Sequence, residues 1–405
     1  MISVSKLLCG AAAPNDHLRY GKSGQTPESF SLQRPIVVWN CTRSCNLHCV
    51  HCYATASNQK YEGELTTDEG KAFLRDLADF KAPVILFSGG EPVMRGDLFD
   101  LASYAKGLGI KVALSTNGTL ITEDVARRLR DVGFGEVGIS LDGIGGNNDR
   151  FRGSKGAFDA ALQGIRNSVS LGLRVSLRLT ITGYNYKDIP AIFDLVEREK
   201  IDRVCIYHLA YVGRAGDKRV DDITPAQTRS VVDFIFEKTA ELHGRGLKKE
   251  ILTVDNHVDG VYLYLKVKRE QPERAAEVLE LLQRNGGNSS GIRIGAVDNL
   301  GNVHADQFWW HYSFGNVRQR KFGDIWMDTS DPLMRGLKNR RPLLKGRCSL
   351  CQYLDLCGGN LRVRAEATYG DVWAPDPACY LTDEEIGLDR SPLPAGTTPA
   401  AGGRP

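Results

Sequence analysis

Three cysteines near the start of the chain have the spacing of metal ligands. Cys45, Cys49 and Cys52 lie in the stretch CNLHCVHCY and form a C-x3-C-x2-C pattern. Three thiolates can bind three irons of a 4Fe–4S cluster and leave the fourth iron open to an exogenous ligand. An open position indicates catalysis, as it does at zinc sites. The same thiols also suit zinc, with a fourth ligand from one of three neighbours: Cys41, His48 or His51.

A second cysteine group lies near the C-terminus. Its C-x2-C-x5-C-x21-C spacing is made by Cys348, Cys351, Cys357 and Cys379. Four thiolates saturate either a 4Fe–4S cluster or one zinc ion. The spacing alone does not choose between these two metals, but it predicts a closed site rather than an open one.

Composition and charge exclude several classes of protein. The 52 basic and 49 acidic residues leave a net charge of +3, so bulk charge gives no sign of a nucleic-acid partner. No apolar stretch approaches the roughly 20 residues that span a membrane. The N-terminus has no convincing signal-peptide pattern, and clustered thiols suit a reducing compartment. We therefore expect a cytoplasmic protein that binds neither nucleic acid nor membrane.

The first cysteine group follows the first of six short β-branched runs that alternate with helical patterns. Such alternation predicts an α/β fold with a parallel sheet. Both an open doubly wound sheet and an incomplete (β/α) barrel agree with it. The six runs are Ile36 to Trp39, Val84 to Ser88, Val112 to Ser115, Val137 to Leu141, Val175 to Ile181 and Val204 to Tyr207.

Polar motifs follow the first four of these strands. The cysteine loop comes after the first strand, SGGEP (88–92) after the second, STNG (115–118) after the third and SLDG (140–143) after the fourth. In both candidate architectures, ligands bind at the carboxyl edge of the strands. We therefore expect these motifs to form one site.

The pattern divides the chain into five regions. We expect an N-terminal extension at 1–34, the βα region at 35–220, a helical connector at 221–285, the domain of the second cysteine group at 286–387, and a disordered tail at 388–405 that is rich in Pro, Gly, Ala and Thr.

The cysteine loop, SGGEP, STNG and SLDG together resemble the radical S-adenosylmethionine (SAM) superfamily. The resemblance implies a partial (β/α)6 barrel and an enzyme in which Cys45, Cys49 and Cys52 hold the catalytic 4Fe–4S cluster. It also implies SAM as cofactor, cleaved reductively to methionine and a 5′-deoxyadenosyl radical that abstracts a substrate hydrogen.

The same resemblance implies which side chains surround SAM. Glu91 suits the methionyl ammonium, while Arg152 and Arg178 suit its carboxylate, because a guanidinium binds a carboxylate with two hydrogen bonds. The serines, Asn117 and Asp142 have an equally ordinary role as caps of turns and helices. The full set is His51, Gly89, Gly90, Glu91, Ser115, Asn117, Ser140, Asp142, Arg152 and Arg178.

The second cysteine group resembles the auxiliary-cluster (SPASM or twitch-like) domain of this superfamily. A hairpin and the segment Gly315 to Val317 precede it, as in those domains. The upstream cysteines of the two-cluster version are absent. The resemblance thus implies one auxiliary 4Fe–4S cluster, and two clusters in the whole chain.

Longer segments resemble a tetrapyrrole-modifying subfamily that includes heme d1 biosynthesis enzymes. They include WNCTRSCNLHCVHCYA and NVHADQFWWHYSFGNVRQRKFGDIW. The resemblance implies removal of two propionates from 12,18-didecarboxysiroheme on the way to the oxo groups of heme d1. An electron donor such as a ferredoxin or flavodoxin would serve it. The alternatives are a sibling heme-pathway decarboxylase, a peptide maturase and a non-enzymatic iron–sulfur electron carrier.

An iron tetrapyrrole is a flat, apolar, polyanionic disc that needs aromatic faces, cations and an optional axial ligand. The expected substrate contacts are His208, His311, Trp309 and Arg362, with either histidine facing the macrocycle. Core packing is the alternative for Trp309 or Trp310. Further candidates are Trp310, Tyr312, Tyr207, Arg318, Arg320 and Arg364.

Overall fold

A computed structural model describes residues 1–21 and 34–388, without the side chains of 217–220. The tail expected at 388–405 therefore lies, from residue 389 on, outside the described residues. Within the described part, no helix is both long enough and apolar enough to cross a membrane.

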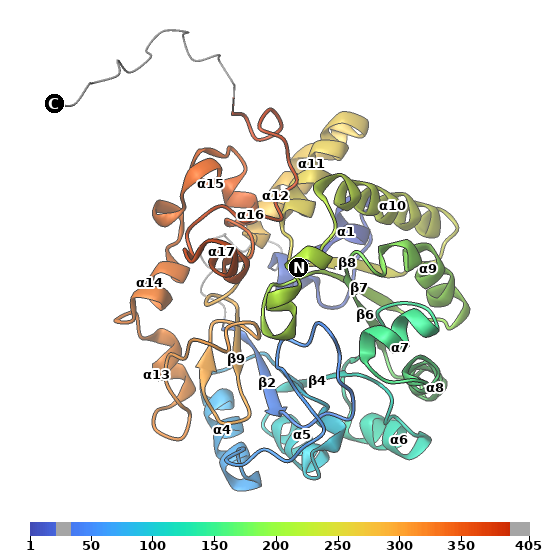
Figure 1. Cartoon of the computed structure of the whole chain (residues 1–405), viewed down its shortest axis with the longest axis vertical. Coiled ribbons are helices and arrows are strands. Elements are labelled where there is room, and N and C mark those ends of the chain that lie inside the picture. The colour runs from blue at the N-terminus through green and yellow to red at the C-terminus, as the bar shows by residue number, and fades with distance from the viewer. Residues whose placement is uncertain (22–33, 389–405) are drawn as a thin grey trace, which may run out of the picture.

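One ten-stranded sheet organises the molecule (Figure 1). Its parallel strands are β2 (Ile36–Thr42), β3 (Val84–Gly89), β4 (Lys111–Thr116), β5 (Val137–Ser140), β6 (Val175–Ile181), β7 (Arg203–His208) and β8 (Glu250–Val254), each paired with the next. β1 (Ile2–Ser3) pairs antiparallel with β8, while β9 (Ile294–Val297) runs parallel to β2 and carries β10 (Val303–His304) antiparallel. The end strands of this order, β1 and β10, do not pair, so the sheet is an incomplete barrel.

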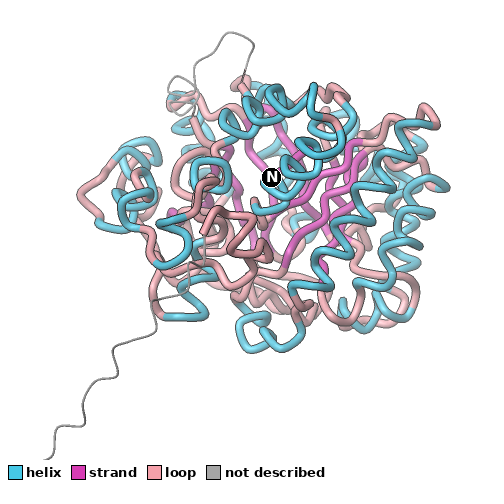
Figure 2. The backbone as a smooth tube through the Cα atoms, turned by 90° about the horizontal axis from the view of Figure 1, so that it is seen from above, coloured by secondary structure: helices cyan, strands magenta, loops and turns pink. Residues whose placement is uncertain are grey.

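Helices cover the outer face of the sheet, and Figure 2 shows the strands enclosed by them. The helices of the barrel are α4 (Thr67–Asp79), α5 (Leu98–Gly107), α6 (Glu123–Val132), α7 (Gly146–Arg152), α8 (Ala157–Ser170), α9 (Ile189–Arg198) and α10 (Pro225–Gly244). Most of them pack apolar side chains inward. In α4, for example, Phe73, Leu74 and Leu77 are buried. By contrast, α7 buries Asn148 and Arg152 beside Phe151.

The α/β prediction with its six parallel strands is confirmed, but the sheet is larger than expected. β8 lies inside 221–285, where we expected only helices, and it adds a seventh parallel strand. Its sequence, EILTV after two lysines, starts with charge and alternates poorly. Glu250 is nevertheless buried, because Arg203 pairs with its carboxylate. The alternation of polar and apolar residues therefore did not predict this strand, because its first residue is a charged side chain that an ion pair allows to be buried.

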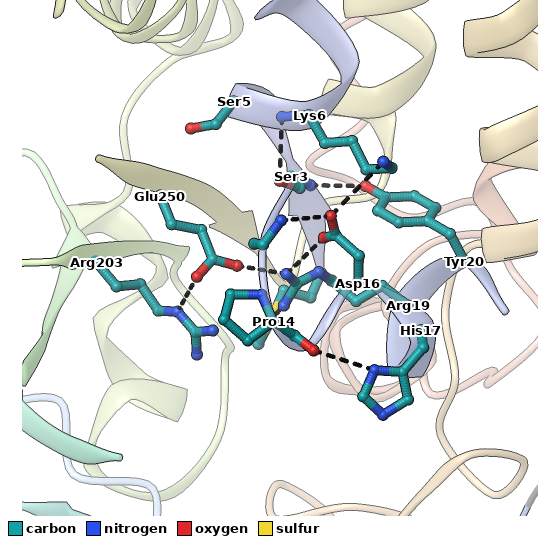
Figure 3. A network of polar contacts seen from close by, with 12 residues as sticks. Ser3, Ser5, Lys6, Pro14, Asp16, His17, Arg19, Tyr20, Arg203 and Glu250 are labelled. Carbon is teal, nitrogen blue, oxygen red and sulfur yellow. Dashed lines mark hydrogen bonds and ion pairs between the residues drawn. The ribbon is translucent and has the colours of Figure 1, made fainter. Parts of the chain in front are cut away.

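The N-terminal residues close one end of the barrel. α1 (Val4–Cys9) and α2 (Asp16–Tyr20) follow β1. The Ser5 hydroxyl donates to the Lys249 carbonyl and accepts from the Ile251 amide. The Ser3 amide donates to the Tyr20 hydroxyl, as Figure 3 shows. The segment is thus a docked part of the barrel rather than a free extension.

The C-terminal part lies beside the open edge of the barrel (Figure 1). It is reached through α11 (Val258–Glu270) and α12 (Ala275–Asn285), and it contains α13 (Phe322–Met327), α14 (Pro332–Lys338), α15 (Gly346–Leu350), α16 (Leu354–Cys357) and α17 (Arg362–Tyr369). β9 joins this part directly to the barrel sheet.

A buried ion pair also fixes the C-terminal part to the barrel. Arg364 of α17 and Asp376 are both fully buried, with Nε 2.8 Å from Oδ1. Arg364 also donates to the carbonyls of Leu209 and Asp255, which follow β7 and β8. One guanidinium therefore holds two strand ends and the cysteine-bearing segment together.

Replacing Arg364 should destabilise the whole chain. Arg364→Gln leaves Asp376 as an unpaired buried carboxylate, and we expect the free energy of unfolding to fall by about 3–5 kcal/mol. Thermal and denaturant unfolding would measure this. As control, Arg320→Gln breaks the exposed Arg320–Asp328 pair and should cost less than about 1 kcal/mol. Equal losses in the two variants would contradict the role given to Arg364.

Candidate active site

The three-cysteine loop between β2 and α4 forms one wall of a cavity of about 470 Å³ inside the barrel, which all three cysteines line. Their sulfurs accept hydrogen bonds: the Leu47 amide donates to Cys45, the Ala56 amide to Cys52 and an Arg152 guanidinium nitrogen to Cys49, at 3.4, 3.4 and 3.7 Å. Donors of this kind stabilise thiolates and tune the potential of an iron–sulfur cluster. Burial nevertheless raises the pKa of Cys45 to about 12 and also raises that of Cys49, so a metal would have to displace their protons.

Gly89 and Gly90 lie directly against this loop. The Gly90 amide donates to the Thr42 carbonyl at 2.7 Å, and the Glu91 amide donates to the Ser44 carbonyl at 2.8 Å. A Cβ at Gly89 would lie 2.1 Å from the Thr42 oxygen, and one at Gly90 would lie 2.2 Å from the Ser44 oxygen. Both glycines also line the cavity. They are required because the cysteine loop itself passes so close.

Glu91 is fully buried and does not line the cavity. Its carboxylate accepts hydrogen bonds from the Thr116 hydroxyl, the Asn117 amide and the Val93 amide at 2.7, 2.7 and 3.1 Å. Its expected contact with an ammonium group stays a prediction. Glu91 ties the end of β3 to the end of β4.

A charged group lies next to the cysteines. Asp142 forms an ion pair with Arg152, and its Oδ2 lies 3.6 Å from His51 Nε2. Burial lowers the pKa of His51 to about 4, so its ring is neutral at neutral pH. His51 Nδ1 and Arg152 Nε are buried without a partner among the described residues. Unsatisfied polar atoms beside a cavity indicate a polar ligand.

The remaining polar residues of the strand ends also face the cavity. Ser115, Asn117 and Ser140 line it. The Asn117 amide nitrogen donates to Asn46 Oδ1 and toward Cys45 Sγ, while its oxygen accepts from the Thr119 amide. Asn117 thus serves as a turn cap and also contacts a cysteine.

Arg178 points away from this group. It lies opposite Ser140 in the sheet register, but its guanidinium rests over Gly138, where a Cβ would be 2.2 Å from Nε. Its nearest carboxylate is Glu136, at 3.6 Å, which immediately precedes β5. The side chain therefore reaches toward the amino-terminal end of the barrel, and the structure does not join it to Arg152 as expected.

The second cysteine group lines one small pocket. Cys348, Cys351, Cys357 and Cys379 surround it together with apolar residues such as Leu354 and Leu381. Burial raises the pKa of all four thiols, that of Cys379 to about 11, and a metal would have to displace their protons. Across residues 1–21 and 34–388, no three His, Cys, Asp or Glu side chains are close enough to hold a single ion.

His208 lines the cavity, but the other three expected substrate contacts do not. Trp309 is fully buried in a cluster with Leu337 and Val363, as the core-packing alternative proposed. His311 is half exposed and bonded to Glu366. These two are held by local packing and a surface ion pair, outside the cavity wall, and their contact with a substrate stays a prediction.

Arg362 is likewise outside the cavity wall. Its guanidinium donates to the carbonyls of Val372, Ala374 and Gly359 and so holds the loops around the second cysteine group. Among the further candidates, Tyr207 lines the cavity, Trp310 packs against the cysteine loop, and Arg318 and Arg320 form surface pairs.

Several cavity residues were not predicted from the sequence. Asp255, His257, Asp306, Arg203 and Arg293 all line it. Asp255 follows β8, the strand that pattern reading missed, and has φ of +64°. An aspartate directly after a strand could have predicted a residue of the site. This prediction would have required β8 to be recognised as a strand first.

Comparisons with known proteins agree with this geometry. A model of the Radical SAM superfamily matches residues 39–196. The chain is 58% identical to the Fe-coproporphyrin III synthase of Methanosarcina barkeri, over 96% of this chain and 99% of that protein. It is 43% identical to the pre-heme d1 synthase of Dinoroseobacter shibae, over 87% and 88% of the two chains.

The chain belongs to the radical SAM superfamily. Streptococcus suis SuiB, in a crystal structure with its precursor peptide SuiA, shares the fold at a TM-score of 0.68 and 20% identity, over 86% of this chain and 76% of that one. Membership makes the protein an enzyme and implies SAM and a 4Fe–4S cluster as its cofactors.

The residues of this radical SAM site fit those cofactors. Cys45, Cys49 and Cys52 would hold the cluster, and the unsatisfied atoms of His51 and Arg152 lie where SAM would supply partners. When bound, the pair supplies a 5′-deoxyadenosyl radical. The chain's own part would be to hold the cysteine sulfurs with N–H donors and to orient SAM.

Gly90→Ala should break the cysteine loop. The added methyl group would overlap the Ser44 carbonyl, so the loop must move and the three thiols lose their arrangement. We expect reconstituted iron to fall by about four atoms per chain, one 4Fe–4S cluster, in iron and sulfide assays. Gly107→Ala, with open space around its Cβ, is the control. Full iron loading of the Gly90 variant would refute the role of this contact.

Asp255 should make stability depend on pH. Burial, and next Asp306, raise the pKa of Asp255 to about 7. A raised carboxyl pKa means that stability is lost as pH rises from the unfolded value toward 7. Asp255→Asn, which tolerates the same φ, should therefore gain stability, by about 2–4 kcal/mol at pH 8 and by less at pH 5.5.

Unfolding curves at both pH values would measure this gain, with the exposed Asp131→Asn as control. A gain that is the same at pH 5.5 and pH 8 would contradict the raised pKa.

Proposed function

We propose that this radical SAM enzyme acts on the side chains of an iron tetrapyrrole of the heme pathways, and that its product is Fe-coproporphyrin III. One observation carries the proposal: a single cavity joins the three-cysteine loop to a group of cationic side chains inside the barrel. The 58% identity to Fe-coproporphyrin III synthase, over nearly the whole length of both chains, supports the product.

The charge of the cavity supports a polyanionic substrate. Cationic side chains outnumber carboxylates on its wall. The cations are Arg19, Lys111, Arg152, Arg178, Arg203, Arg214 and Arg293, and the carboxylates are Glu136, Asp142, Asp255 and Asp306. Phe308, Tyr53 and Tyr207 add aromatic surface. A tetrapyrrole carboxylic acid needs both features.

Of the two histidines expected to face the macrocycle, His208 is the one that lines the cavity. Its Nε2 lies 2.9 Å from Asp259 Oδ2, and the Tyr380 hydroxyl donates to Asp259 Oδ1 at 2.8 Å. A carboxylate behind a histidine fixes its tautomer and orientation, as it does behind metal ligands. Tyr380 directly follows Cys379, so this chain of contacts runs from the second cysteine group to the cavity.

For the second cysteine group we propose one auxiliary 4Fe–4S cluster. Four cysteines around an apolar pocket, next to the cations of Arg347 and Arg362, suit the negative charge of such a cluster. A ferredoxin or flavodoxin as electron donor and a cytoplasmic location complete the proposal.

The second candidate is the heme d1 step, in which two propionates of 12,18-didecarboxysiroheme are removed. The 43% identity to pre-heme d1 synthase favours it. The two candidates differ in their products. Coproporphyrin keeps a propionate on every pyrrole ring, whereas the heme d1 step removes propionates.

An anaerobic assay with 12,18-didecarboxysiroheme, SAM and a reductant separates the candidates. We expect substrate-dependent 5′-deoxyadenosine and a pigment with the mass of Fe-coproporphyrin III. A pigment that has lost two propionates would establish the heme d1 step instead, and no substrate-dependent 5′-deoxyadenosine would refute both.

Cysteine variants provide the controls. Cys45→Ala should reduce 5′-deoxyadenosine to background, whereas Cys9→Ala, which alters a partly buried thiol of α1, should not. Cys351→Ala should retain the first cluster but impair turnover. Normal turnover of Cys351→Ala would show that the auxiliary site has no catalytic part.

A further inference from the structure

A network of buried charges closes the amino-terminal end of the barrel (Figure 3). Arg203 begins β7 and Glu250 begins β8, with Arg203 Nε 2.7 Å from Glu250 Oε2. Arg203 also pairs with Glu136, and Arg19 of α2 pairs with Glu250. This group, the barrel floor, therefore joins side chains at the starts of neighbouring strands to the N-terminal helix α2.

The mostly buried charges of the barrel floor balance in number. They are the cations Arg19, Arg178 and Arg203 and the carboxylates Asp16, Glu136 and Glu250, whereas Arg174 is partly exposed and Lys111 is exposed. The pairing is nevertheless incomplete, because Nε of Arg178 and Nη2 of Arg203 are buried without a partner among the described residues. Buried polar groups without partners are costly, and an anion inside the barrel would supply them.

Arg178 is one of four floor cations that line the cavity, with Arg19, Lys111 and Arg203. It makes no hydrogen bond with the residues that the structure describes, and its nearest carboxylate lies at 3.6 Å, beyond hydrogen-bond distance. Gly138 leaves the space that its guanidinium occupies. An arginine has five N–H donors, and inside a protein these are normally used.

Two neighbours complete the site. Arg203 is 5% exposed, lines the cavity, and has Nη2 buried without a partner among the described residues. Tyr207 of β7 lines the same cavity, and its strand pairs with that of Arg178. Two guanidinium groups and a phenol on adjacent strands have the chemistry of a carboxylate site.

We propose that Arg178, supported by Arg203 and Tyr207, binds a side-chain carboxylate of the substrate inside the barrel. The inference rests on the proposed function and names the part of the cavity that recognises the acid groups. β6 spans roughly 20 Å at about 3.3 Å per residue, so the floor and the cysteine loop lie at opposite ends of one lumen. A macrocycle held by its acid group at the floor is oriented toward the cysteine loop.

The test compares an acid with its ester. Fe-coproporphyrin III and its tetramethyl ester are titrated into the cluster-loaded enzyme, and their Kd values are read from the visible absorption. We expect wild type to prefer the acid. Arg178→Gln should weaken binding of the acid about 10- to 100-fold and leave that of the ester unchanged, because the lost hydrogen bonds are to a charged group. Tyr207→Phe should weaken binding of the acid several-fold.

Arg174→Gln is the matched control. Arg174 pairs with Glu250 but does not line the cavity. The Arg174→Gln variant should therefore bind the acid with nearly the affinity of wild type. If Arg174→Gln weakens binding of the acid as much as Arg178→Gln does, the loss of affinity comes from long-range electrostatics. The proposed contact with Arg178 would then be wrong.

Two further outcomes would overturn the inference. Arg178→Gln could instead weaken the binding of SAM and leave that of the acid unchanged. Arg178 would then bind the methionyl carboxylate of SAM, as the sequence predicted. Equal binding of acid and ester by wild type would refute carboxylate recognition but leave the proposed function standing. If wild type binds neither ligand, the proposed function itself fails, and the inference with it.

Discussion

The backbone contact between the cysteine loop and Gly89–Gly90 is the constraint on which the site depends. Two hydrogen bonds, from the Gly90 and Glu91 amides to the Thr42 and Ser44 carbonyls, join the loop after β2 to the loop after β3. Glu91 then joins β3 to β4 through Thr116 and Asn117. Neighbouring strand ends thereby position the thiols, and polar groups of β5 and β6 complete the wall of the cavity.

The barrel separates two kinds of chemistry along its axis. At the carboxyl ends of the strands lie the cysteines with His51, Asp142 and Arg152. At the amino ends lie Arg203 and its carboxylate partners, closed from below by the N-terminal helix α2. A substrate between these ends would be recognised at one and attacked at the other. The parallel strands make this possible, because every strand has the same direction.

Local patterns predicted much of this structure, and long-range pairing accounts for the rest. The six strands and the cysteine loop follow from periodicity and spacing, which are encoded within a few residues. β8 was not predicted because its first residue, Glu250, is charged, and the sequence does not show that Arg203, which is distant in the chain, pairs with it. Trp309 packs in the core, which was the alternative that its residue type left open. Arg178 extends toward Glu136 at the start of β5, and a sequence could not give this direction because it predicts the strand but not the course of the side chain.

The central claim is that the cysteine loop holds a cluster with one open iron that SAM can bind. The most direct measurement is electron paramagnetic resonance of the reduced protein, with Cys348, Cys351, Cys357 and Cys379 replaced by alanine so that any remaining cluster is held by the three-cysteine loop. The account predicts a 4Fe–4S signal that changes when SAM is added. A signal unchanged by SAM, or a chain that binds zinc in place of iron, would contradict it.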